Sequence, residues 1–119
     1  MSLFDNVICE YPLPDGWEHM QHYTFQTHSL NDRGDIYRIG ADGMLYVREL
    51  YWLSDEERAD PALPRGALVS HRPETLAPID RVFDFCTFEI EGDYESGLIY
   101  FVAAFEGATL KRLAYFGRE

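Results

Sequence analysis

The clearest strand pattern lies in the last third of the chain. Residues 98–105 form a run of eight without a charge. The run is too short to span a membrane, and both of its alternating faces are apolar. This pattern is typical of a strand covered on two sides, either central in a sheet or within an interface. Residues 81–90 and 109–116 flank it across short turn-like segments, which predicts an antiparallel meander of three strands.

Five shorter runs with strand character precede the meander. They cover residues 3–11, 22–28, 35–39, 44–53 and 67–71. Residues 36–39 are predicted to pair with residues 44–47 as a hairpin, because residues 40–43 form a turn with two glycines. Ser54, with Glu57 three residues later, fits a capping box and predicts a short helical turn through Ala59. Four prolines make residues 60–80 a mostly irregular connection.

These elements predict a mainly β protein with a single domain spanning residues 1–119. The expected architecture is an antiparallel sheet of six to eight strands, forming a sandwich or an open barrel, with at most one short helix. The alternative is an α+β arrangement in which a short helix from residues 54–60 packs against the sheet.

Charge narrows the classes of function. Twenty-one acidic residues face ten basic ones, which gives a net charge of −11. Such a field repels nucleic acid and anionic membranes and attracts a basic partner, although acidity also serves solubility alone. The start of the chain has no secretory signal pattern, and two cysteines without CxxC spacing, Cys9 and Cys86, are expected to be reduced. We therefore expect a cytoplasmic protein.

Few residues suggest catalysis or metal binding. His19 and His22, with His28 and Glu18, could supply four zinc ligands, but the loop-to-strand pattern of this segment disfavours a site, and we expect no metal and no cofactor. No G-x-S-x-G or phosphate loop occurs, so we expect no enzyme.

Two residues in the meander raise more specific questions. Cys86 is a nucleophile only if His71 lies near it, and its phenylalanine neighbours predict an inert thiol. Asp84 shares one face of its strand with apolar residues. If that face points inward, the buried carboxylate needs a partner such as Arg48 or Arg112.

The opening 1-MSLFDNV-7 with 11-YPLP-14 resembles the start of a set of small proteins carried by phages and prophages of Gram-negative bacteria. The similarity continues weakly at residues 25–30, 35–39 and 42–45 and resumes at residues 101–110, about half of the chain. These are mainly strand and turn positions, and the similar proteins supply no catalytic residues to carry over. Where they tend to have arginines in the penultimate strand, this chain has Val102 and Ala104, which suits a buried or partner-covered face.

Together, the charge and the resemblance suggest a non-enzymatic phage or mobile-element type of protein that acts by protein–protein contact. Its most concrete form is an inhibitor that mimics nucleic acid against a basic bacterial protein, such as a host defence complex. The expected partner-binding residues are two clusters of turn carboxylates: Asp55, Glu56, Glu57 and Asp60, and Glu91, Asp93 and Glu95. The alternatives are a β-barrel that binds a small ligand or carbohydrate, and a homo-oligomeric prophage accessory protein.

Overall fold

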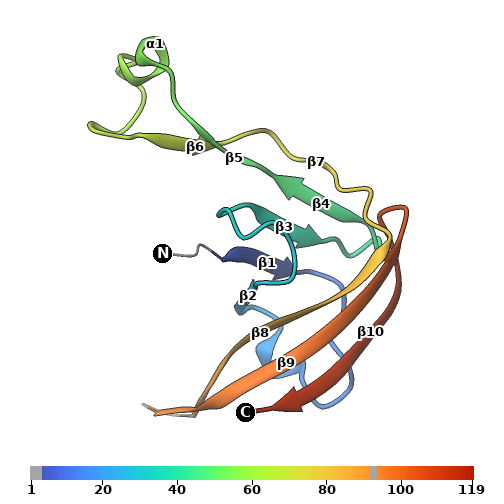
Figure 1. Ribbon diagram of the computed structural model, residues 1–119. Coiled ribbons are helices and arrows are strands. Elements are labelled where there is room, and N and C mark those ends of the chain that lie inside the picture. The colour runs from blue at the N-terminus through green and yellow to red at the C-terminus, as the bar shows by residue number, and fades with distance from the viewer. Residues whose placement is uncertain (1–3, 92–93) are drawn as a thin grey trace.

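The protein is a curled sheet with a projecting arm, as a computed structural model shows (Figure 1). The structure describes residues 4–91 and 94–119. Its elements are β1 (Asp5–Cys9), η1 (Glu18–Met20), β2 (Thr24–Thr27), β3 (Ile36–Ile39), β4 (Leu45–Arg48), β5 (Leu50–Trp52), α1 (Asp55–Arg58), β6 (Val69–His71), β7 (Thr75–Leu76), β8 (Arg81–Glu91), β9 (Tyr94–Glu106) and β10 (Thr109–Arg118).

Eight of these strands form one sheet in the order β10-β9-β8-β2-β1-β3-β4-β7. All of its pairs are antiparallel except β1 with β3. The sheet curls into a half-barrel, and β5 with β6 makes a separate two-stranded sheet. The prediction of a mainly β fold with six to eight strands in an open, curled sheet and one short helix is confirmed.

The predicted meander and hairpin are both present. β8 pairs with β9, and β9 with β10, over most of their lengths. In the hairpin, Tyr37 lies opposite Val47 and Ile39 opposite Leu45. The turn of this hairpin meets the β9–β10 turn, where Leu45 donates its N–H to Ala108 O at 2.8 Å. This contact holds the two ends of the curl together at one side (Figure 1).

The inner face of the curl is filled by aromatic rings. Phe25 from β2 packs edge-on against Phe85 with ring centroids 5.1 Å apart, and Phe85 stacks on Phe101 of β9 at 5.8 Å. Phe83 stacks on Phe105 in the same layer. All five rings are buried, so this layer is the core that joins the N-terminal strands to the meander.

Two details of the predicted strands are wrong. The run at residues 44–53 is not one strand: it breaks at Glu49 into β4 and β5, and β5 leaves the main sheet. β9 is central in the meander, but only the face with Phe101 and Ala103 is buried. The opposite face, with Tyr100 and Val102, is half-exposed. Among the described residues, β9 is therefore fully covered on one face and only partly covered on the other.

Candidate interaction surface

Residues 50–71 project from the half-barrel and are called the arm below. The arm consists of β5, α1 and β6 with their connecting loops, and it carries α1 at its tip, away from the curled sheet (Figure 1). β5 and β6 pair only with each other, from Leu50 opposite His71 to Trp52 opposite Val69. Because a two-stranded ribbon has no core of its own, its side chains are largely available to solvent and partners.

A buried carboxylate directs the chain into the arm. Asp35, fully buried, accepts the N–H of Leu50 at 2.9 Å and the Nε–H of Arg33 at 2.8 Å. The Leu50 N–H therefore bonds a side chain where a continuing strand would bond its neighbour. On the other side of the root, His71 Nε2 lies 3.0 Å from Gly34 O. Contacts to the loop at residues 31–35 thus fix both strands of the arm at its root.

The helix at the tip follows the predicted capping box. Ser54 Oγ accepts the N–H of Glu57 at 3.2 Å, and the Glu57 carboxylate accepts the N–H of Ser54 at 3.1 Å. The hydroxyl of Tyr51 also donates to Glu57, at 3.0 Å. These bonds lower the pKa of Glu57, with the Ser54 N–H as the largest cause. The Glu57 carboxylate therefore stabilises the tip of the arm through hydrogen bonds within the chain, which leaves it less available to a partner.

The other three predicted carboxylates of the arm are more accessible. The side chain of Asp55 is 94% exposed, although it forms an ion pair with Arg58 on the next turn of the helix. Asp60 is exposed and accepts the N–H of Ala62 at 2.9 Å. Glu56 is exposed on α1. The structure thus brings the cluster at residues 55–60 together on one small projection.

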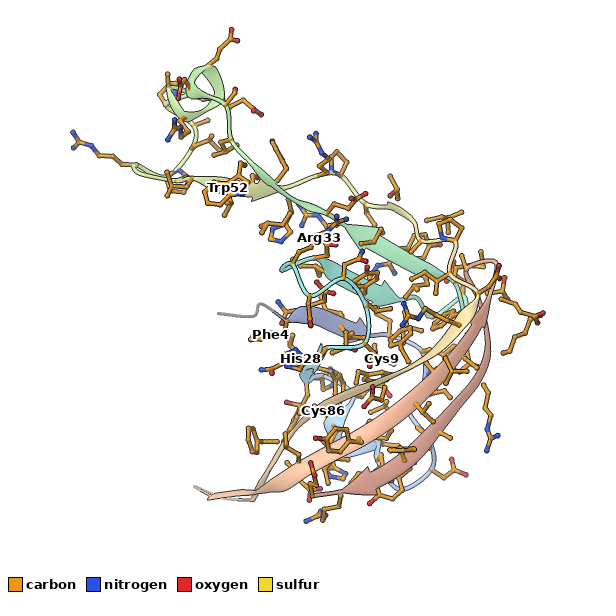
Figure 2. All side chains as sticks on the ribbon, in the orientation of Figure 1. Phe4, Cys9, His28, Arg33, Trp52 and Cys86 are labelled. Carbon is orange, nitrogen blue, oxygen red and sulfur yellow. The ribbon has the colours of Figure 1, made fainter. Side chains whose placement is uncertain are left out.

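Large apolar side chains share this projection, which the sequence pattern did not reveal. Trp52 is 75% exposed and Leu68 is 50% exposed, and Figure 2 shows Trp52 on the arm, away from the core. Leu68 also lines a hollow of about 370 Å³, together with Asp55 and Arg58. Tryptophan and arginine are enriched at protein-binding surfaces, whereas acidic residues are depleted from the core of such surfaces.

The second predicted cluster has no described side chains. The backbones of Glu91 and Glu95 lie at the facing ends of β8 and β9. Their side chains, and Asp93 altogether, lie outside the described residues. The expectation that these three carboxylates bind a partner stays a prediction.

The histidines considered as metal ligands are separated from one another. His19 Nε2 lies 2.7 Å from the carboxylate of Glu89, and His28 Nδ1 lies 3.1 Å from Asp32. His22 is exposed just before β2. Among the side chains that the structure describes, no group of three or more from His, Cys, Asp or Glu is arranged to hold a metal ion.

The polar residues of the meander have other partners than expected. The carboxylate of Asp84 is hydrogen-bonded to the hydroxyl of Ser29, not to Arg48 or Arg112, because Asp84 points away from the core toward the loop after β2. Cys86 is half-buried, and burial is the main cause that raises its thiol pKa. His71 is engaged at the arm's root instead.

Cys9 is buried within β1 and is not disulfide-bonded. Burial raises the pKa of its thiol to about 12, and its Sγ–H donates to Tyr11 O at 3.2 Å. A thiol of this kind is protonated at neutral pH and is a packing group.

No protein-family model, curated protein sequence or solved structure matches the chain. Among the described residues, no helix is long and apolar enough to cross a membrane.

Proposed function

We propose that the protein acts by protein–protein contact and that the arm is its contact surface. The observation that carries this proposal is the coincidence, on one projecting element, of exposed carboxylates and exposed apolar side chains around Trp52. Steering by the charges and desolvation of the apolar groups are the two contributions that a specific interface combines.

The charge indicates the kind of partner. A chain with a net charge of −11 associates readily with a basic protein, and the arm presents Asp55, Glu56 and Asp60 ahead of the body. A basic surface that binds nucleic acid meets phosphates with arginine and lysine, and carboxylates can take the place of those phosphates. In this proposal the protein is an inhibitor that occupies such a surface, for example in a bacterial defence complex.

A small-ligand barrel has less support. Its ligand would occupy the concave face, and the rings of Phe25, Phe85 and Phe101 fill that face. The aromatic residues that this alternative needs as stacking surfaces are therefore core residues.

The test is affinity capture from a bacterial lysate, followed by competition. The captured partner is mixed with a labelled nucleic acid duplex, and the acidic protein described here is then added at a series of salt concentrations. The wild type should displace the duplex, with an affinity that falls as salt rises. The double variant Glu56→Lys with Asp60→Lys should bind at least tenfold more weakly, and Trp52→Ala should weaken binding even at high salt.

The matched control changes the same number of charges elsewhere. Asp15→Lys with Glu106→Lys alters two exposed carboxylates outside the arm, at the loop after β1 and the end of β9. It should bind far better than the arm variant. Equal losses in the two double variants would mean that net charge alone attracts the partner, and intact binding by Trp52→Ala and the arm variant would refute the arm as the contact surface.

A further inference from the structure

A hollow of about 350 Å³ lies on the face of the meander that points away from the core, and it is called the outer-face hollow below. Its lining includes Asp84 of β8, Tyr100 of β9 and Phe116 of β10, together with Arg118 and Glu119. The pairing of β8 with β9 and of β9 with β10 sets these strands side by side. Asp84 and Tyr100 are half-buried, whereas Phe116 is 66% exposed, so the hollow is accessible from solvent.

Two carboxylates of the hollow are bonded to neutral groups. Asp84 is hydrogen-bonded to the hydroxyl of Ser29, and Glu119 accepts the hydroxyl of Tyr100 at 2.8 Å. Within the described part of the chain, neither Asp84 nor Glu119 forms an ion pair. The outer-face hollow therefore keeps the negative charge of both carboxylates.

The electrostatic field of both carboxylates reaches the same place. The pKa of Tyr100 is raised to about 12, mainly by its hydrogen bond to Glu119, with the charge of Asp84 among the further causes. Asp84 and Glu119 also raise the pKa of Cys86, which lies opposite Tyr100, although burial is the larger cause there. Neighbouring groups on β8 and β9 thus respond to the same two charges. A cation between these carboxylates is stabilised by both of them.

Another part of the protein shows how such groups hold a guanidinium. Arg38 donates to the carboxylates of Glu10 and Glu74, and its guanidinium lies 4.3 Å from the centroid of the Tyr46 ring. The hydroxyl of Tyr46 donates to Asp42 at 2.6 Å. The outer-face hollow has corresponding groups: two carboxylates, a tyrosine whose hydroxyl donates to one of them, and an exposed phenylalanine ring. These groups suit a planar cation that pairs with carboxylate and stacks on a ring.

We propose that the outer-face hollow binds the guanidinium group of an arginine side chain that another protein presents. Asp84 and Glu119 accept its N–H groups, and the ring of Phe116 stacks on its planar face. The hollow lies on β8 to β10 and contains no residue of the arm, so this site goes beyond the contact surface proposed above.

The chemistry of the hollow disfavours other ligands. An anion such as phosphate is repelled by the two carboxylates, and the basic residue of the lining, Arg118, is paired with Glu89. A free small molecule needs a pocket that buries most of its surface, whereas this hollow is open on the side of Phe116. One side chain anchored by a surrounding interface has no such requirement.

The test is a nuclear magnetic resonance titration of the isotope-labelled full chain with three short peptides. The peptides have blocked ends and differ only in their central residue, which is arginine, lysine or citrulline, the neutral isostere of arginine. The arginine peptide should shift amide signals of β8 to β10 around the hollow. The lysine peptide should bind several-fold more weakly, because an ammonium group neither stacks nor pairs in a bidentate manner, and the citrulline peptide should cause no shifts. Equal binding of the arginine peptide and either of the others overturns the proposal, as do shifts confined to other elements.

Variants of the lining test the site itself. Asp84→Asn with Glu119→Gln keeps an acceptor oxygen for each hydroxyl partner but removes both charges, and it should weaken binding of the arginine peptide by about tenfold or more. Phe116→Leu, at an exposed ring, should weaken it several-fold. Glu106→Gln, at an exposed carboxylate outside the hollow, is the matched control, and Trp52→Ala tests independence from the arm; both should leave the affinity unchanged. The amide spectra show whether each variant is folded. An affinity that survives the loss of both charges overturns the proposal.

Discussion

Asp5 and Asp35 are linked directly: the carboxylate of Asp5 accepts the backbone N–H of Asp35 at 2.9 Å, and both side chains are fully buried. Asp5 also accepts the N–H groups of Asn31, Asp32 and Arg33. Asp35 in turn accepts the N–H of Leu50. Two buried carboxylates thus connect β1, the loop at residues 31–35 and the root of the arm.

The first prediction concerns this link. Asp5→Asn keeps the size of the side chain but replaces one acceptor oxygen by an N–H₂ donor that faces backbone donors. We expect a loss of about 3 kcal/mol or more in the free energy of unfolding, because buried N–H groups lose charged acceptors. Urea denaturation measures it. Asp15→Asn, at an exposed turn position, is the control and should change stability by less than about 0.5 kcal/mol. A tolerated Asp5→Asn would mean that the loop is held by other contacts.

The second prediction concerns the aromatic core. Phe101 contacts the rings of Phe25, Phe85 and Trp17 and is fully buried. Phe101→Ala should therefore cost about 3–5 kcal/mol of unfolding free energy. Leu76→Ala, at a residue that is half-exposed on β7, should cost about 0.5 kcal/mol. A loss below about 1 kcal/mol at Phe101 would contradict a central position of this ring.

The third prediction concerns alkaline pH. Burial raises the pKa of the Cys9 thiol from its ordinary value of 9.0 to about 12, and it raises the pKa of Tyr37 to about 12. The folded state holds these protons more tightly than the unfolded state, so stability is complete below pH 9 and falls as pH rises toward 12. Cys9→Ala should make this decline shallower in a pH series of urea midpoints. An unchanged slope would show that Cys9 does not contribute.

The fourth prediction concerns thiol reactivity. In the native state at pH 8, a thiol reagent should label Cys9 far more slowly than in urea, because the thiol is buried and protonated. Cys86, which is half-buried on β8, should react faster than Cys9 but slower than an unfolded thiol. Mass spectrometry of the single variants Cys9→Ala and Cys86→Ala separates the two rates. Immediate native labelling of Cys9 would place it at the surface.

The fifth prediction concerns the tip of the arm. Ser54→Ala removes the acceptor of the Glu57 N–H, a change that costs about 0.5–2 kcal/mol of local helix stability. Because α1 buries no residue, the midpoint of global unfolding should hardly move. Hydrogen exchange should become faster at residues 55–60 and stay unchanged in β8 to β10. A drop in the global midpoint would mean that the arm is part of the cooperative core.

The sequence predicted the elements that depend on local pattern. The predicted runs around Val7, Phe25 and Ile39 form β1, β2 and β3, and Ser54 with Glu57 caps α1 as predicted. The candidate interaction surface on the arm could be predicted only in part from local sequence pattern. Trp52 belonged to a predicted strand whose break depends on the Asp35–Leu50 contact, between residues 15 positions apart. The partner of Asp84 is 55 positions away. Contacts of this range leave no periodic signal in the chain.

The strand order has a consequence for synthesis on the ribosome. β1 to β4 are made first, but β2 completes its place in the sheet only when β8 pairs with it, Gln26 opposite Cys86. The nascent N-terminal half therefore exposes Val7 and Phe25 until the last third of the chain has emerged. The meander is accordingly expected to close locally, and its encounter with β2 is expected to set the rate of folding.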